Sequence, residues 1–333
     1  CRAICTASDS GQHPLTVVFR TASHLNSGNQ DMNVKLSKAN NLLLVCLLTL
    51  MPVLAGADTL ERVRTTQSFT LGYLPNFPPF SAQASDIPSG YAIDLCLKIA
   101  DKVKTELALP GLQIRYLSVS PTDEINAVSS GKIDILCTPT APTLERRKRV
   151  SYSVPVYTAG LSVVVRQDAP QPLLNALAGK VANTGPTWRA TINHGLSNQT
   201  YAAIAGGVTE TWIRERMRLL GVVATLVTVE NTAAGLKQVA EGKADAFFAE
   251  RMVLKNLLAT DKSASNLVLL DRIFEYAPTA MAVDRNDEDF RLLVDTALSD
   301  MYRSGEIEQA FDKYLGGADD TAKKLFKVYA LPQ

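Results

Sequence analysis

Hydroxyl-bearing and cationic residues gather directly after a short apolar run of this chain. The run Gly131-Lys-Ile-Asp-Ile-Leu-Cys137 is followed by Thr138-Pro-Thr-Ala-Pro-Thr-Leu-Glu-Arg146. A guanidinium can hold a carboxylate through two parallel hydrogen bonds, and neighbouring hydroxyls and backbone N–H groups can satisfy the remaining lone pairs. These residue types in this order predict a site for a small carboxylate.

The cationic run 146–149 has a second interpretation. Runs of this kind are typical of solvated surfaces and of nucleic-acid patches, so spacing leaves a plain surface loop as open as a site. Beyond residue 57, however, the chain carries 30 Lys and Arg residues against 31 Asp and Glu residues. This near-neutral balance argues against nucleic acid as a partner.

Residues 32–57 have the pattern of a secretory signal. Lys35 and Lys38 precede the apolar run 42–54, and the small residues 55–57 follow it. A membrane anchor is the alternative, but the run is shorter than the roughly 20 residues that a spanning helix needs. We therefore expect a cleaved signal and a periplasmic protein.

Two further expectations concern this leading part of the chain. Residues 1–31 lack an initial Met and precede a good start at Met32, so we interpret them as an upstream or artefactual segment. Cys46 follows Val45 rather than a small residue, so the pattern for lipid attachment is not met.

Beyond residue 57 the cysteines are Cys96 and Cys137. An even pair in an exported protein suggests one disulfide, and two buried thiols are the alternative. His194 is the single histidine of this part of the sequence, with no Cys/His metal spacing and no Gly-x-Ser-x-Gly motif. We expect no metal or other cofactor.

Strand and helix patterns alternate along the chain. Strands are expected at 69–74, 112–117, 133–136, 161–165, 224–229 and 244–248, and helices at about 91–106, 122–130 and 232–241, with two more within 289–315 that break at 304–305. The segment 236–247 echoes 125–136, since each has a helix, a Gly, a Lys and an Asp before an apolar strand. This alternation predicts an α/β protein of two similar lobes.

Five short motifs in order carry a resemblance to a known family. They are Phe77-Pro-Pro-Phe80, Gly-Tyr-x-x-Asp-Leu at 90–95, Gly-Lys-Ile-Asp at 131–134, Glu-Arg-Arg-Lys at 145–148 with Tyr-Ser-x-Pro after it, and Gly-Lys-Ala-Asp-Ala at 242–246. Over Leu60 to Gly316 the chain resembles the extracytoplasmic solute-binding proteins of family 3, which serve polar amino-acid ABC transporters. Within them it is most similar to the glutamate/aspartate-binding group.

The resemblance implies an architecture and a partner. The fold would be the two-lobed, type II periplasmic-binding-protein α/β fold, whose chain crosses the hinge twice, near Gly160 and near 276–278. Lobe 1 would comprise 58–160 plus 277–333, and lobe 2 would comprise 161–276. An amino acid or related small carboxylate would close the hinge, and an ABC permease in the inner membrane would receive it.

The resemblance also implies ligand-binding residues. Arg146 would hold the ligand α-carboxylate, in a loop with Thr140, Ala141 and Thr143. Glu250 would pair with the α-ammonium. An aromatic residue, Phe77, would cover the ligand, and the turn Gly185 to Thr187, with Trp188 after it, would add contacts from lobe 2.

Several positions depart from the family pattern. Glu250 replaces an Asp, Ala141 replaces a hydroxyl residue, and Pro186 removes a backbone donor from the second-lobe turn. The segment 122–124, Thr-Asp-Glu, occupies a place where the glutamate/aspartate group has a basic residue. The ligand is therefore not necessarily an acidic amino acid.

Alternative roles remain open for single residues. Phe77 is also compatible with a plain core position, and Trp188 with packing. Glu250 is also compatible with an ion pair to Arg251 or Arg146.

Two other classes of function remain open as well. Some dehydratases acting on cyclohexadienyl carboxylates share this fold, and Glu250 could serve there as a general acid. A sensor would use the same cleft. The sequence up to Gln333 contains no kinase or cyclase segment, so signalling would need a separate membrane partner. We expect a binding protein rather than an enzyme.

Overall fold

The computed structural model describes residues 58–83, 85–180, 195–261 and 264–332. The expected upstream segment 1–31 and the expected signal 32–57 lie outside these residues. Within the described part, no helix is long and apolar enough to cross a membrane.

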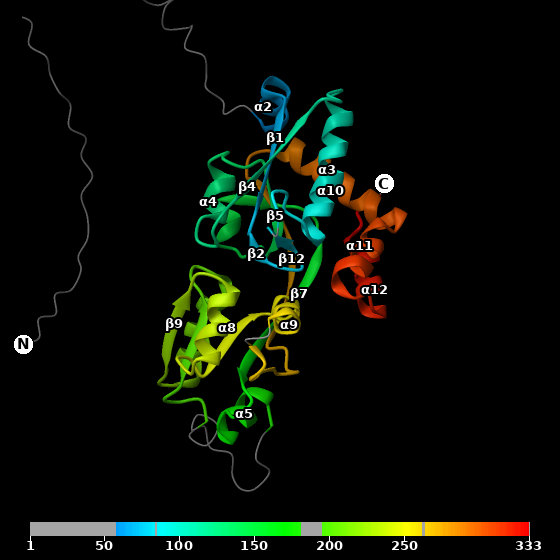
Figure 1. Ribbon diagram of the computed structural model, residues 1–333. Helices are drawn as coiled ribbons and strands as arrows, with labels where there is room; N and C mark the ends of the chain where they lie inside the picture. Colours follow the sequence, from blue (N-terminus) through cyan, green and yellow to red (C-terminus); the bar gives the residue numbers. More distant parts are fainter. Residues whose placement is uncertain (1–57, 84, 181–194, 262–263, 333) are drawn as a thin grey trace, which may run out of the picture. The chain divides into compact units, whose positions relative to one another are not determined.

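The first lobe is built on a mixed sheet (Figure 1). Its strands are β4 (Gln113–Ser118), β1 (Ser68–Tyr73), β5 (Ile135–Thr140), β12 (Glu275–Asp284) and β6 (Val150–Tyr152). β1 runs parallel to both β4 and β5, whereas β12 runs antiparallel to β5 and β6. Its helical elements are α2 (Thr59–Thr66), α3 (Tyr91–Glu106), α4 (Glu124–Ser129), the short 3₁₀ helix η1 (Arg146–Lys148), α10 (Glu288–Ser304), α11 (Glu306–Leu315) and α12 (Asp320–Tyr329).

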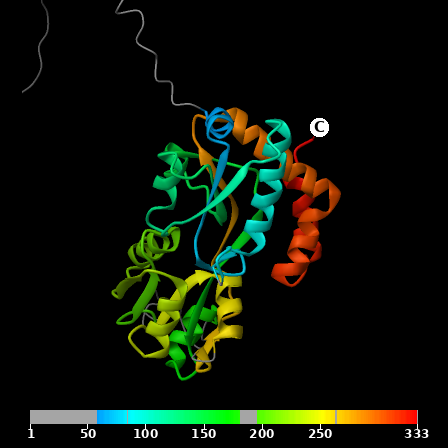
Figure 2. The same cartoon turned by 45° about the horizontal axis from the view of Figure 1, so that its top comes forward.

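Helix α3 shows how the apolar pattern builds this lobe. Ile93, Ile99 and Val103 recur at helical spacing and are fully buried, as the sequence predicts. The C-terminal helices α10 and α11 contact α3 although they are distant in the chain, and they lie beside it in both views (Figures 1 and 2). The end of the chain therefore completes the core that its beginning starts.

The second lobe repeats the α/β plan. Its strands are β7 (Tyr157–Arg166), β10 (Ala246–Glu250), β8 (Thr200–Ile204), β9 (Thr225–Val229) and β11 (Leu267–Leu269), and its helices are α5 (Gln171–Ala178), α7 (Val208–Leu220), α8 (Thr232–Ala240) and α9 (Arg251–Thr260). β10 and β9 run parallel to β8, whereas β7 is antiparallel to β10 and β11.

Two long strands connect the lobes. β7 and β12 pair antiparallel, with Tyr276 opposite Gly160 and Ala277 opposite Ala159. Further along, β12 pairs with β5 and β6 of the first lobe, while β7 continues into the sheet of the second. The expected two-lobed α/β fold with a double crossover is thereby confirmed.

The repeated helix, Gly, Lys, Asp pattern has a structural explanation. Asp134 accepts a hydrogen bond from the backbone N–H of Thr70 at 2.6 Å and donates its own N–H to the carbonyl of Thr70 at 2.9 Å. Asp245 makes the same two bonds with Thr200, each at 2.7 Å. In each lobe, this Asp ties the start of its strand to a parallel neighbour.

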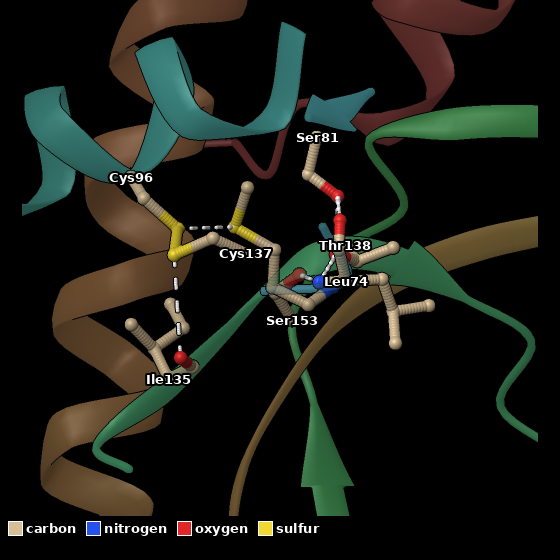
Figure 3. Close-up of a disulfide and its surroundings, with 8 residues drawn as sticks. Leu74, Ser81, Cys96, Ile135, Cys137, Thr138 and Ser153 are labelled. Atoms are coloured by element: carbon tan, nitrogen blue, oxygen red, sulfur yellow. Dashed lines mark hydrogen bonds between the residues drawn. A yellow bond between two sulfur atoms is a disulfide. The ribbon is translucent and has the colours of Figure 1, made fainter. Parts of the chain in front are cut away.

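A disulfide joins Cys96 on α3 to Cys137 on β5, with the two Cα atoms 6.0 Å apart (Figure 3). The adjacent Thr138 accepts a hydrogen bond from the backbone N–H of Leu74 at 3.0 Å and shares one with the hydroxyl of Ser81 at 2.8 Å. These bonds tie both ends of the loop 74–81 to the strand.

Several elements differ from the sequence prediction, among them the following three. The strand predicted at 133–136 is β5, which begins at Ile135 and extends to Thr140, because β12, distant in sequence, supplies Ala280 as a partner for Thr140. The proline-rich loop contains two paired strands of two residues each, β2 (Asn76–Phe77) and β3 (Ser81–Ala82). Helix α12, which was not predicted, packs Phe326 against Phe311 with ring centroids 4.9 Å apart.

Candidate functional site

A cavity of about 730 Å³ is lined by residues of both lobes. On the first lobe, residues at the ends of β1 and β5 and at the start of α4 line it. On the second lobe, residues at the end of β10 and at the starts of α7 and α8 line it. The predicted site residues within the described part of the chain all line it: Phe77, Thr140, Ala141, Thr143, Arg146 and Glu250. The other three, Gly185, Thr187 and Trp188, lie outside the described residues.

Arg146 is held in a network of polar groups. Its Nη2 atom lies 2.8 Å from Oε1 of Glu124, and its Nη1 donates to the hydroxyl of Thr140. The hydroxyl of Thr140 in turn contacts Oε1 of Glu124 at 3.2 Å, and Thr143 accepts a hydrogen bond from the backbone N–H of Arg146. The side chains of Arg146 and Glu124 are only 14% and 6% exposed.

The three cations after Arg146 are exposed and do not line the cavity. Arg147 lies over the ring of Tyr152, Lys148 pairs with Glu145, and Arg149 donates to Asn126. Arg146 is therefore the member of the run that faces the cavity.

Glu124 is a cavity residue that the predicted site did not include. It begins α4, and burial raises the pKa of its carboxyl, whereas the Arg146 guanidinium and the Thr140 hydroxyl oppose that rise. The sequence did contain a sign of this residue, because 122–124 is acidic where the glutamate/aspartate-binding group has a basic residue.

Glu250 lies at the junction of β10 and α9. Its Oε2 accepts the backbone N–H of Val253 at 2.9 Å, which caps α9, and its Oε1 accepts the Tyr157 hydroxyl at 3.2 Å and the Gly160 N–H at 3.5 Å. Burial raises the pKa of Glu250 to about 7, and these hydrogen bonds oppose the rise. The carboxylate is thus supported by neutral donors.

The alternative ion pairs of Glu250 are absent from the described residues. Arg146 pairs with Glu124, and Arg251 donates to the carbonyl of Leu270 at 2.8 Å and lies 3.5 Å from Asp271. An ion pair between Glu250 and either arginine is therefore the wrong interpretation.

Phe77 fits both roles considered for it. Its ring is half-buried, packs against the core and lies 5.7 Å from the ring of Phe80, and the residue also lines the cavity. The loop that Thr138 holds in place thereby presents an aromatic surface to the cavity.

The second lobe adds residues that sequence reasoning missed. Trp212 on α7 lines the cavity and donates its indole N–H to Glu275 at 3.0 Å. Thr232, the first residue of α8, also lines it, and its buried hydroxyl has no hydrogen-bond partner among the described residues. An aromatic residue within a helix and a Thr at a helix start are too common to predict a site from sequence.

The described residues contain no group of three or more His, Cys, Asp or Glu side chains that could hold a metal ion. The polar groups of the cavity are instead one guanidinium, several carboxylates and hydroxyls. This arrangement can bind charged groups of a small molecule by hydrogen bonds and ion pairs.

Comparison with known proteins identifies relatives along most of the chain. It is 27% identical over 275 residues to the L-glutamate/L-aspartate-binding protein of Pseudomonas aeruginosa, covering 81% of this chain and 85% of that protein. It is 21% identical over 277 residues to the L-cystine-binding protein TcyJ of Escherichia coli, covering 82% and 92%.

Solved structures share the fold. A mutant of ArgBP from T. maritima matches with a TM-score of 0.62 and 19% identity over 78% of this chain and 99% of that one. The ancestral amino acid-binding protein AncCDT-1, a precursor of cyclohexadienyl dehydratase, matches with a TM-score of 0.62 and 22% identity over 77% and 99%. The model of the bacterial extracellular solute-binding proteins, family 3, matches residues 69–317, in agreement with the motifs in the sequence. The chain belongs to this family.

Proposed function

We propose that this protein captures a small α-amino acid in the periplasm and delivers it to an ABC permease of the inner membrane. Its relatives are named for binding glutamate and aspartate, cystine or arginine, all of which are amino acids. Membership of an extracellular solute-binding family supports the location and the transport role.

The observation that carries the proposal is the pairing of opposite charges across one cavity. Arg146 comes from the first lobe and Glu250 from the second, and both line the same space. A zwitterion that leaves water needs a partner for each of its charges. In the proposed complex, Arg146 binds the α-carboxylate and Glu250 binds the α-ammonium.

The neighbouring groups suit this arrangement. A guanidinium has five N–H donors, so its contacts with Glu124 and Thr140 leave donors for a ligand carboxylate. Thr143 and the unpartnered hydroxyl of Thr232 add polar groups, and Phe77 adds an apolar cover.

We further propose that the ligand closes the two lobes around itself. Lobe 1 would comprise 58–160 plus 277–333 and lobe 2 would comprise 161–276, with β7 and β12 as the hinge. A ligand that contacts both lobes binds the closed state better than the open state, and this difference drives closure.

A calorimetric screen of the protein against the common amino acids and small dicarboxylates tests the proposal. We expect at least one α-amino acid to bind, and Arg146→Ala to abolish binding while Arg149→Ala, at an exposed position, retains it. Free ligand at about 100 times its dissociation constant stabilises the folded protein by about 2.7 kcal/mol, so a thermal shift provides a second readout. Failure of every amino acid to bind would reject the proposal.

A dehydratase activity is the second candidate, because Glu250 is a cavity carboxyl whose pKa is raised to about 7. Such a group is partly protonated at neutral pH, as a general acid must be. Incubation with prephenate or arogenate, followed by product absorbance, distinguishes the two functions. We expect no turnover, and turnover that is lost in Glu250→Gln would favour the enzyme.

A further inference from the structure

The cavity is rich in carboxylates and poor in cations. Among the described residues that line it, the carboxylates are Glu124, Glu230, Glu250 and Glu275, and the cation is Arg146. Glu275 is half exposed and lies 3.7 Å from Arg216, so solvent and a neighbouring cation already compensate its charge. The more buried charges, which decide the electrostatics of binding, are those of Glu124, Arg146 and Glu250.

Glu124 already uses the cation that a ligand carboxylate would need. Its carboxylate lies 2.8 Å from the Arg146 guanidinium, and both side chains are largely buried. A ligand carboxylate bound to Arg146 would make two carboxylates share one guanidinium. The α-ammonium of the ligand would meanwhile be matched by Glu250.

A count of these charges depends on the ligand side chain. With an α-amino acid of neutral side chain, the cationic groups are Arg146 and the α-ammonium. The carboxylates are those of Glu124, Glu250 and the ligand, so one negative charge is left uncompensated. An acidic side chain would leave two, whereas a cationic side chain would leave none. An uncompensated charge in a site removed from water is costly, so the closed complex selects against the first two classes.

We infer that this protein selects α-amino acids whose side chain carries a positive charge, and that Glu124 is the residue that determines this selection. The inference rests on the proposed function, since it assumes that Arg146 and Glu250 hold the α-amino acid group. Glu230, directly after β9, is exposed and lines the cavity, so it adds a further carboxylate that solvent screens.

The experiment compares L-arginine with L-citrulline, which has nearly the same shape but no side-chain charge, and adds L-lysine, L-glutamine and L-glutamate. Calorimetry on the purified protein should show arginine or lysine binding at least about tenfold more tightly than citrulline and glutamine, a difference of about 1.4 kcal/mol. Glutamate should bind most weakly. This comparison decides the charge of the ligand without any variant.

The variant Glu124→Gln keeps the size of the side chain and removes its charge. It should reduce the preference for arginine over citrulline to less than about threefold, mainly by weakening arginine, since it removes the negative charge that the side-chain cation would compensate. Glu215→Gln, which removes an exposed carboxylate of α7 outside the cavity, should leave the preference unchanged.

Two outcomes would overturn the inference while the proposed function stands. One is tighter binding of a neutral or acidic amino acid than of arginine and lysine. The other is an undiminished preference for arginine in Glu124→Gln. If no amino acid binds the wild-type protein, the proposed function and the inference fail together.

Discussion

At the scale of single residues, Arg146 and Glu124 depend on one another. Both side chains are largely buried, so removal of one leaves the other as an unpaired buried charge. Arg146→Met should therefore lower the free energy of unfolding of the ligand-free protein by about 3–5 kcal/mol, the range for breaking a buried pair. The double variant Arg146→Met/Glu124→Met should recover much of this loss.

Urea unfolding of the two single variants and the double variant measures this coupling. Arg149→Met serves as a control, because Arg149 is exposed and lies outside the cavity. Additive losses in the double variant would show that the two groups act independently and would contradict the ion pair.

Glu250 predicts the pH dependence of binding. Burial raises its pKa to about 7, yet it must be ionised to pair with a ligand ammonium. Below pH 7 each binding event must release a proton, so affinity should fall by up to about tenfold per pH unit, and above pH 8 it should be nearly constant.

Calorimetry between pH 5.5 and 8.5 in buffers of different ionisation enthalpy measures both the affinity and the proton release. Glu250→Gln should bind more weakly at pH 8 and should lose most of this pH dependence. Affinity that rises as the pH falls would contradict the assignment of Glu250 to the ammonium.

The sequence predicted the residues of the first-lobe site better than those of the second. The segment Thr138 to Arg146 is continuous in sequence, so residue type and order suggested Thr140, Thr143 and Arg146 as neighbours, and the family resemblance favoured a site over a surface loop. Trp212 and Thr232 reach the same cavity only through the packing of α7 and α8. The Arg146–Glu124 pair joins residues 22 positions apart on either side of β5, so no local pattern of sequence predicts it.

At the scale of elements, the close approach of α3 to the loop 74–81 positions Phe77. Gly90, the residue before α3, has φ of 138° and ψ of 173°, which only glycine adopts without strain. A Cβ there would lie 2.4 Å from the carbonyl oxygen of Phe80. Gly90→Ala should therefore lower the free energy of unfolding by at least about 2 kcal/mol.

Gly111→Ala is the matched control, because a Cβ at Gly111 meets nothing within 4 Å. Thermal and urea unfolding of both variants should separate them clearly. Equal stability of the two variants would mean that the approach at Gly90 is less tight than the structure has it.

Local patterns predicted helices and strands well where the apolar period is regular, as in α3, α10 and α11. They failed where pairing decides the element. The extension of β5 to Thr140 and the short strands β6 and β11 exist because β12 and β7 supply partners from distant parts of the chain. Such partners cannot be read from a local window of sequence.

At the scale of the whole molecule, β7 and β12 form the connection about which the lobes would move. A ligand held between Arg146 and Glu250 should reduce the radius of gyration of the protein, because it draws the two lobes together. Small-angle X-ray scattering with and without saturating ligand measures this change. Arg146→Ala at the same ligand concentration should show no reduction, and an unchanged radius in the wild type would contradict closure.

The two-lobed fold itself was predictable, because the helix, Gly, Lys, Asp pattern occurs twice and each copy builds the same joint between strands. The double crossover was predicted by the family resemblance, since local periodicity carries no information about β12 pairing with both β7 and β5. Residues 181–194, which include the predicted contacts Gly185, Thr187 and Trp188, lie outside the described part and remain a prediction.

Two ligands that differ only in the α-carboxylate show whether Arg146 binds that group. Calorimetry should compare the best-binding amino acid with its α-carboxamide, which keeps the ammonium and the side chain. Loss of two hydrogen bonds to a charged group, at about 1.5–3 kcal/mol each, predicts that the carboxamide binds at least about a hundredfold more weakly. Equal affinity for the two compounds would mean that Arg146 does not bind the α-carboxylate.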